Sequence, residues 1–194
     1  MKKFRLALIF LVGFSLNALS QNTNNGYNSY ENNTLNYISN LSDKNDINWS
    51  EIIKTFESYF KNIDLVVDSK RDTSFYFKIL DHLQHGGGTS ETGQLIDKQS
   101  AELIGKLNKQ GLTRDISKNC LYEYLKNYET NKKVETVPWS FHVIGTCISK
   151  YKEFNEEVHP AFVIAAIKEM KPADYKKDLY KRSIILLIYY MYSK

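Results

Sequence analysis

The chain of 194 residues has little cysteine and proline, with two and three residues respectively. It also lacks the short motifs that mark common catalytic sites. The Gly-x-Ser-x-Gly motif of a serine nucleophile elbow is absent. The glycine run at 86–88 neither follows an apolar strand nor leads into Gly-Lys-Ser/Thr, which disfavours a phosphate-binding P-loop. No motif of a known family identifies functional residues, so function has to be argued from individual residues.

An excess of basic charge is also lacking once the N-terminus is set aside. Residues 1–20 combine a basic start, an apolar run and small residues, which is the pattern of a cleaved export signal. Removing them takes away Lys2, Lys3 and Arg5 but no acidic residue, so the formal net charge falls from +4 to +1. A nucleic-acid-binding domain needs a clearly basic face. We therefore expect an exported protein, periplasmic or secreted, with no nucleic-acid partner.

The most apolar stretch beyond the signal is 184–192, with nine consecutive aliphatic or aromatic residues. It is shorter than the roughly 20 residues that a transmembrane helix needs. We therefore expect no stable membrane insertion after signal removal. Because a helix that is apolar on every side is buried, and no Gly or Pro follows Ala173, the pattern predicts one long central helix over 173–194.

Apolar spacing and capping residues predict an all-α domain over 48–194, with about seven helices packed around that central helix. Starts are expected near 49, 73, 92, 114, 138, 160 and 173. Asn48 and Thr113 are good N-caps, and Pro138 suits a helix start. Alternate helices are separated by roughly 41 to 46 residues, a spacing compatible with HEAT-like paired helices. An irregular bundle is the preferred architecture.

The segment between the signal and this domain, 21–47, is predicted to be a flexible leader. Its first part, 21–33, is rich in Asn and nearly without aliphatic residues, so burial would not offset its ordering entropy. Leu35, Ile38 and Leu41 are spaced for one helix face, which allows a short helix at 34–41.

Candidate metal ligands lie in the unusual stretch 81–93. His82 and His85 are three residues apart on a predicted helix and can share a face, and Glu91 follows the glycine run. No further ligand is fixed by the spacing. The alternative is a helix C-terminus at which His85 interacts with the helix dipole. No cofactor is predicted, and an enzyme is the less favoured class.

Cys120 and Cys147 are predicted to form an intrachain disulfide. Each lies on the inner side of one of two consecutive predicted helices, and Gly145 allows the close approach that such a bridge needs. Export to an oxidising compartment would preserve it. Buried thiols and a nucleophile are the alternatives. His142 cannot pair directly with Cys147, because a separation of five residues places them on different faces.

Aromatic residues outside the apolar faces are candidates for a binding surface. Trp49, Trp139 and Tyr175 are of this kind, and exposed Trp and Tyr often anchor protein interfaces. Packing over helix ends is the alternative. We therefore hypothesise an exported non-enzymatic protein-binding module, most concretely an inhibitor or immunity-type protein that binds another exported protein. The alternatives are a metal-binding protein or metal-dependent enzyme using His82 and His85, and a helical small-ligand carrier.

Overall fold

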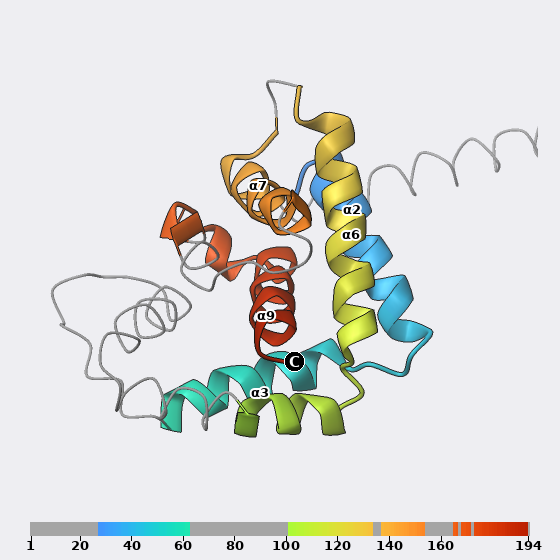
Figure 1. The fold of residues 1–194 in the computed structure, drawn as a ribbon, viewed down its shortest axis with the longest axis vertical. Coiled ribbons are helices and arrows are strands. Elements are labelled where there is room, and N and C mark those ends of the chain that lie inside the picture. Colours follow the sequence, from blue (N-terminus) through green and yellow to red (C-terminus); the bar gives the residue numbers. More distant parts are fainter. Residues whose placement is uncertain are drawn as a thin grey trace, which may run out of the picture.

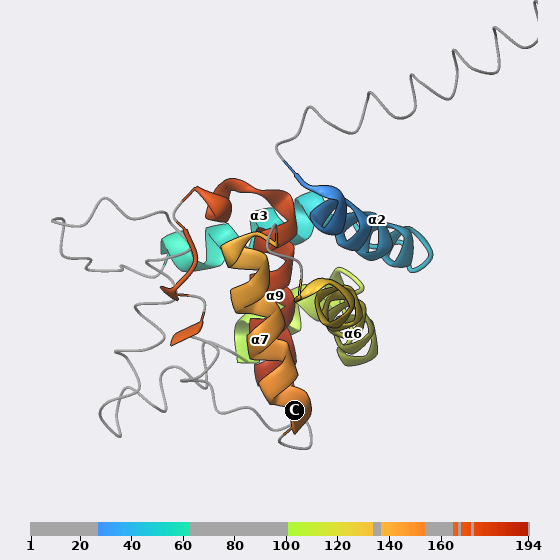
Figure 2. The ribbon, with the colours of Figure 1, turned by 90° about the horizontal axis from the view of Figure 1, so that it is seen from above.

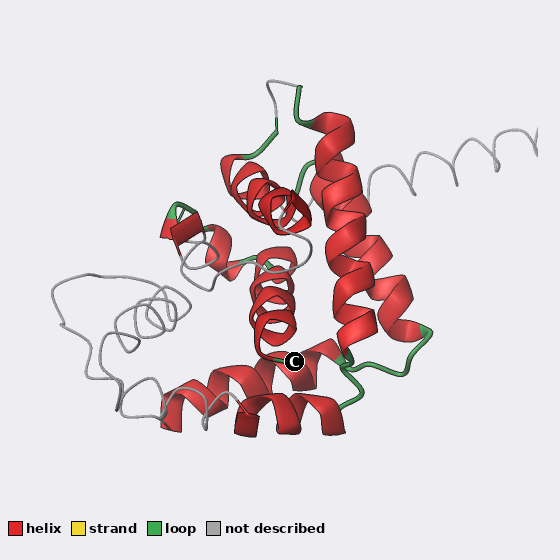
Figure 3. Cartoon of the chain, in the orientation of Figure 1, coloured by secondary structure: helices red, strands yellow, loops and turns green. Residues whose placement is uncertain are grey.

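The fold is described by a computed structural model, which covers residues 27–62, 101–133, 137–153, 165–166, 168–171 and 173–193. Helix is the regular structure of these ranges, and no strand occurs in them (Figures 1 and 3). This confirms the all-α class. The bounded helices are α2 (Ser29–Asp43), α3 (Trp49–Asn62), α6 (Arg114–Asn131), α7 (Trp139–Glu153), the short 3-10 helix η1 (Asp174–Lys176) and α9 (Asp178–Tyr192). Residues 101–109 are helical as well.

Helix α9 is the buried centre of the described bundle, as its apolar sequence predicts. Residues 183–190 are all buried. Helices α2, α3 and α6 pack against α9, which lies between α7 and α3 in Figure 1. The prediction of one uninterrupted helix from Ala173 is wrong. Lys177 has extended backbone (φ −80°, ψ 133°) between η1 and α9, and its ammonium group pairs with Asp174 on η1 and with Glu31 on α2.

Helix α2 shows that the packed chain begins before Asn48. The short helix that the spacing allows over 34–41 lies within α2, which extends back to Ser29 into the segment expected to be flexible. Residues 21–26 lie outside the described ranges. Glu31 and Asn28 form a capping box, with backbone N–H to side-chain oxygen distances of 2.8 and 3.0 Å. The buried face of α2 includes polar residues whose hydroxyl groups bond to the helix backbone, as Ser42 does to Ile38 at 2.6 Å. Apolar spacing alone misses such a face.

The predicted helix starts near 49, 114 and 138 agree with the structure. The Asn48 side chain accepts a hydrogen bond from the Ser50 N–H at 3.1 Å at the start of α3. The Thr113 hydroxyl accepts from the Ile116 N–H at 3.3 Å at the start of α6. Pro138 directly precedes α7. These signals are local in sequence, because each cap bonds to a residue two or three positions away.

Helices α6 and α7 cross, and this explains why the predicted disulfide is wrong. Figure 1 shows α6 from the side and α7 nearly end-on, whereas Figure 2 shows the reverse. The close approach at Gly145 accommodates the Tyr128 ring, which would lie 2.2 Å from a Cβ atom there. Cys120 is eight residues, or about 12 Å, along α6 from Tyr128. Cys120 and Cys147 are therefore separate, buried free thiols.

Several predictions concern residues outside the described ranges. The segments 63–100 and 154–164 contain the helices expected near 73 and 160, so the count of seven helices stays a prediction, as does HEAT-like pairing. His82, His85 and Glu91 lie in the first of these segments. Among the described helices, none is long and apolar enough to cross a bilayer.

Candidate functional site

The two thiols are poorly placed for nucleophilic chemistry. Burial raises the pKa of Cys120 to about 12, although the charge of Arg182 opposes the shift. Burial alone raises the pKa of Cys147 to about 12. Because the thiolate is the reactive form, both side chains stay protonated and inert near neutral pH. They act as small core residues.

The three aromatic residues predicted at an interface have different positions. Trp49 and Tyr175 are buried, so they are not available to a partner, whereas Trp139 is 49% exposed. Among the described residues, Tyr37 on α2 is the other large exposed aromatic side chain, at 39%. The predicted metal ligands cannot be placed, and the described chain has no group of three His, Cys, Asp or Glu side chains arranged to hold a metal ion.

Trp139 is held in one orientation even though half of its surface is exposed. It is the first residue of α7, and its Nε1–H donates to the Glu169 carbonyl at 2.8 Å. Its ring stacks on His142, with centroids 5.7 Å apart and planes inclined by 30°. The Tyr128 hydroxyl lies 3.2 Å from His142 Nδ1 and 3.1 Å from the Thr146 hydroxyl. Packing and hydrogen bonds thus fix the tryptophan and the ring beneath it.

A second group of polar residues joins the N-terminal end of α2 to the start of α9. The Glu31 side chain is 1% exposed. Its Oε1 accepts from the Tyr180 hydroxyl at 2.5 Å and lies 3.3 Å from Lys177 Nζ, while Oε2 accepts from the Asn28 N–H at 2.8 Å. Burial, the nearby Tyr124 and the contact with Glu31 all raise the pKa of Tyr180. The hydroxyl is therefore a stable donor at neutral pH.

The same group extends to α7 through η1. Asp174 pairs with Lys177 at 3.1 Å and accepts from the Ser140 hydroxyl at 2.5 Å. Burial lowers the pKa of Lys177, but bonds and charges from Asp174 and Glu31 outweigh it, so the net pKa is raised. Each charge has an opposite charge within contact distance. This arrangement holds three helices together and leaves little capacity for a ligand.

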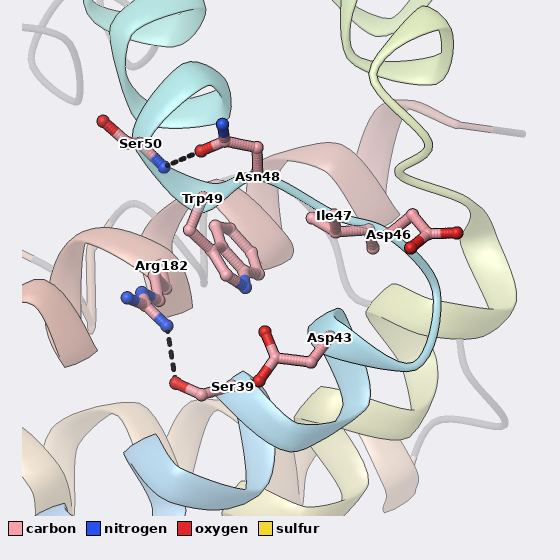
Figure 4. A pocket seen from close by; sticks show the side chains of 8 residues that line it. All are labelled: Ser39, Asp43, Asp46, Ile47, Asn48, Trp49, Ser50 and Arg182. Atoms are coloured by element: carbon pink, nitrogen blue, oxygen red, sulfur yellow. Dashed lines mark hydrogen bonds between the residues drawn. The ribbon is translucent and has the colours of Figure 1, made fainter.

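A pocket of about 560 Å³ lies at the other end of the α2–α9 contact, beside the connection from α2 to α3. Figure 4 shows the side chains that line it. They are Ser39, Asp43, Asp46, Ile47, Asn48, Trp49, Ser50 and Arg182.

The Arg182 guanidinium forms one wall of this pocket. It lies over the Trp49 ring, with Cζ 5.4 Å from the ring centroid. One terminal nitrogen donates to the Ser39 hydroxyl at 2.9 Å and the other to Asp178 at 3.4 Å. Its Nε is buried and has no hydrogen-bond partner among the described residues. Burial lowers the pKa of Arg182, and the charges of Asp178 and Asp43 oppose the shift.

Asp43 supplies the opposite charge in this pocket. Figure 4 shows its carboxylate facing the same hollow as the guanidinium and the Ser39 hydroxyl. No ion pair joins Asp43 to Arg182, although both are described. The pocket thus contains a positive and a negative group that influence each other without being in contact.

The sequence contains no signal for this pocket. Arg182 belongs to a polar stretch that reads as a solvated helix start, and it lies more than 130 positions from the α2 residues opposite. By contrast, the α2 cap could have been found from the local pattern Asn28-Ser-Tyr-Glu31.

Comparison of the chain with protein-family models, with curated proteins and with solved structures finds no significant match. The structure itself defines the class, an all-helical bundle. The exposed Trp139 and the charged pocket at Arg182 are therefore the features that bear on function.

Proposed function

We propose that the protein is an exported, non-enzymatic binding module, most concretely an inhibitor or immunity-type protein that covers part of another exported protein. The observation that supports this is the fixed, half-exposed Trp139. Tryptophan is enriched among the few residues that dominate binding energy at interfaces. A side chain that is already immobilised loses little entropy when a partner covers it. Trp139 is thus suited to anchor an interface.

The polar interior supports the non-enzymatic part of this proposal. Both thiols have pKa values raised to about 12 and are buried. The Glu31 carboxylate, which could otherwise serve as an acid or base, is inaccessible and accepts three hydrogen bonds from its own chain. These groups stabilise the fold rather than act on a substrate.

Export is supported by the pattern of residues 1–20, which lie outside the described ranges. The expected mature protein begins near Gln21. N-terminal sequencing of the product from its native host tests this. A membrane-bound product that retains Met1 would refute it.

The binding role is tested by comparing Trp139→Ala with Tyr37→Ala. Both variants remove an exposed aromatic ring, but no hydrogen bond or ring contact is recorded for Tyr37 in the described chain. Partners captured from the exported fraction are identified by mass spectrometry, purified and titrated against each variant. We expect Trp139→Ala to weaken binding at least tenfold, about 1.4 kcal/mol, and Tyr37→Ala to have little effect. Equal affinities for wild type and Trp139→Ala would refute the role of this surface.

Two alternatives remain. The metal-dependent one depends on His82 and His85, with Glu91, and has only the sequence in its support. Elemental analysis of the purified protein tests it, because one metal ion per chain that is lost in the double His→Ala variant would favour it over the binding module. The ligand-carrier alternative is favoured by the Arg182 pocket. An irregular bundle of about seven helices is the finer architecture that we propose for either role, with HEAT-like pairing as the alternative.

A further inference from the structure

We propose that the pocket between α2, α3 and α9 binds a small zwitterion of the amino-acid class, with Arg182 binding the carboxylate and Asp43 the ammonium group. This pocket is separate from the surface around Trp139, which lies on α7. For the small-ligand carrier alternative, it means that the ligand belongs to the amino-acid class.

Arg182 has N–H donors that the described residues leave unused. A guanidinium has five N–H donors. The described structure records two acceptors for them, the Ser39 hydroxyl at 2.9 Å and Asp178 at 3.4 Å. The Asp178 side chain is 55% exposed, so that contact is weak. Guanidinium groups bind most strongly to a planar carboxylate through two parallel hydrogen bonds. No described residue provides such a partner, whereas a ligand carboxylate can.

The Arg182 cation is held at the wall of the pocket. The Arg182 side chain is only 14% exposed and rests on the Trp49 ring. The Trp49 indole is itself buried and donates to the Ser42 hydroxyl. Because water screens such a group less than it screens a surface arginine, a carboxylate in contact with it is attracted more strongly.

The acidic residues of the pocket favour a zwitterion over a simple anion. Asp43 and Asp46 also line the pocket, so an anion such as phosphate would be repelled by them. A ligand that carries both charges avoids this cost, since its ammonium group can approach the Asp43 carboxylate across the hollow (Figure 4). The volume of about 560 Å³ lies within the ~300–1,000 Å³ range of small-molecule sites and has room for an amino acid.

Two-dimensional ¹H–¹⁵N NMR tests this directly, because the chain has only two tryptophans. The Trp49 indole N–H reports on the pocket, and the Trp139 indole is an internal control on another surface. The full chain is titrated with a panel of free amino acids, and with acetate and methylammonium as single-charge probes. We expect at least one amino acid to shift the Trp49 signal saturably without shifting Trp139. Acetate and methylammonium should bind at least tenfold more weakly.

Two matched variants locate the charges. Asp43→Asn should weaken amino-acid binding at least tenfold while leaving acetate binding unchanged or stronger. Asp46→Asn makes the same charge change three residues further on, in the connection to α3, but the Asp46 carboxylate points away from Arg182 in Figure 4, so we expect less than a threefold effect. Asn also tolerates the positive φ of 54° at this position. Equal losses in the two variants would refute a direct contact with Asp43.

The ligand class is wrong if no amino acid shifts Trp49 below about 10 mM, a Kd that corresponds to only ~3 kcal/mol, or if acetate binds as tightly as the zwitterions. Trp139→Ala should leave amino-acid binding unchanged. The experiments therefore distinguish a failure of the amino-acid-binding proposal from a failure of the protein-binding proposal.

Discussion

The two ends of the contact between α2 and α9 place a charge in contrasting surroundings. At one end, Glu31 is buried and contacts the ammonium group of Lys177 and the hydroxyl of Tyr180. At the other end, Arg182 has a neutral acceptor in Ser39, a longer contact to an exposed carboxylate, and a buried Nε without a partner. Both charged side chains join α2 to α9. Among the described residues, both oxygens of Glu31 accept hydrogen bonds, whereas Arg182 has donors without an acceptor.

The difference indicates which charge supports the fold and which can serve a ligand. A buried charge that has lost water destabilises the protein unless partners replace that water. Glu31 has such partners within the chain, so its removal disturbs the groups around it. Arg182 lacks part of this compensation, so its removal should disturb the fold little. The comparison can be tested by stability measurements at both ends.

The largest expected effect is that of Glu31→Ala. The substitution removes the acceptor of Tyr180 and the buried partner of Lys177, and it breaks the capping box with Asn28. Loss of one member of a buried charge pair costs about 3–5 kcal/mol. We expect a loss of at least about 3 kcal/mol in the free energy of unfolding, measured by urea denaturation of the full chain. Glu31→Gln, which keeps the shape, should lose less. A loss below about 1 kcal/mol for Glu31→Ala would contradict the conclusion that Glu31 supports the fold.

A packing contact without charge gives a reference for these energies. A Cβ at Gly145 would lie 2.2 Å from the Tyr128 ring, whereas one at Gly105 meets nothing within 4 Å. We expect Gly145→Ala to destabilise the protein by about 1–3 kcal/mol through overpacking. Gly105→Ala should stabilise it by roughly 0.5–1 kcal/mol through helix propensity. Thermal denaturation of both variants checks this, and shifts of the same sign would contradict the tight approach of α6 and α7.

These contrasts also show what can be predicted from the sequence. The buried α9 follows from its nine consecutive apolar residues, and the helix starts follow from Asn48 and Thr113, because these signals are local. Helix α2 was underestimated because Glu31, Thr34 and Ser42 are on its buried face. A polar residue on such a face depends on hydrogen-bond partners that the local sequence does not identify.

The candidate sites depend more on tertiary geometry. The same reasoning selected Trp139, which is exposed, and Trp49 and Tyr175, which are buried. Burial of a lone aromatic residue is decided by helices that are distant in sequence. The disulfide prediction was wrong for a similar reason, because two inner-facing cysteines on consecutive helices meet only if the helices pack in the right orientation, and α6 and α7 cross instead.

Alkaline pH provides a smaller, reversible test of the Glu31 end. The pKa of Tyr180 is raised by burial and by its neighbours Tyr124 and Glu31. The folded state therefore keeps this proton above pH ~10, where the unfolded chain loses it. Its contribution to stability is complete below the unfolded pKa and is lost as pH rises toward the folded one, at up to about 1.4 kcal/mol per pH unit. Tyr180→Phe should make this decline shallower. An unchanged slope would mean that Tyr180 does not keep its proton.

The smallest effect is expected at the Arg182 end, where Arg182→Met should change the free energy of unfolding by about 1 kcal/mol or less. Methionine keeps an apolar chain against Trp49 and removes a cation whose hydrogen bonds go to one hydroxyl and one exposed carboxylate. Its matched control is Lys177→Met, which leaves Glu31 buried without a positive partner and should cost about 3 kcal/mol.

The difference in the free energy of unfolding between Arg182→Met and Lys177→Met measures how differently the two cations support the fold. Urea denaturation at neutral pH gives both values under the same conditions. If Arg182→Met costs as much as Lys177→Met, Arg182 supports the fold in the way that Lys177 does, and its remaining donors are not available to a ligand. The opposite outcome is that Arg182→Met leaves the free energy of unfolding nearly unchanged while added amino acids no longer shift its Trp49 indole signal. In that case Arg182 contributes to ligand binding rather than to the fold. Because the same variant is measured for stability and for binding, a loss of binding cannot be attributed to unfolding.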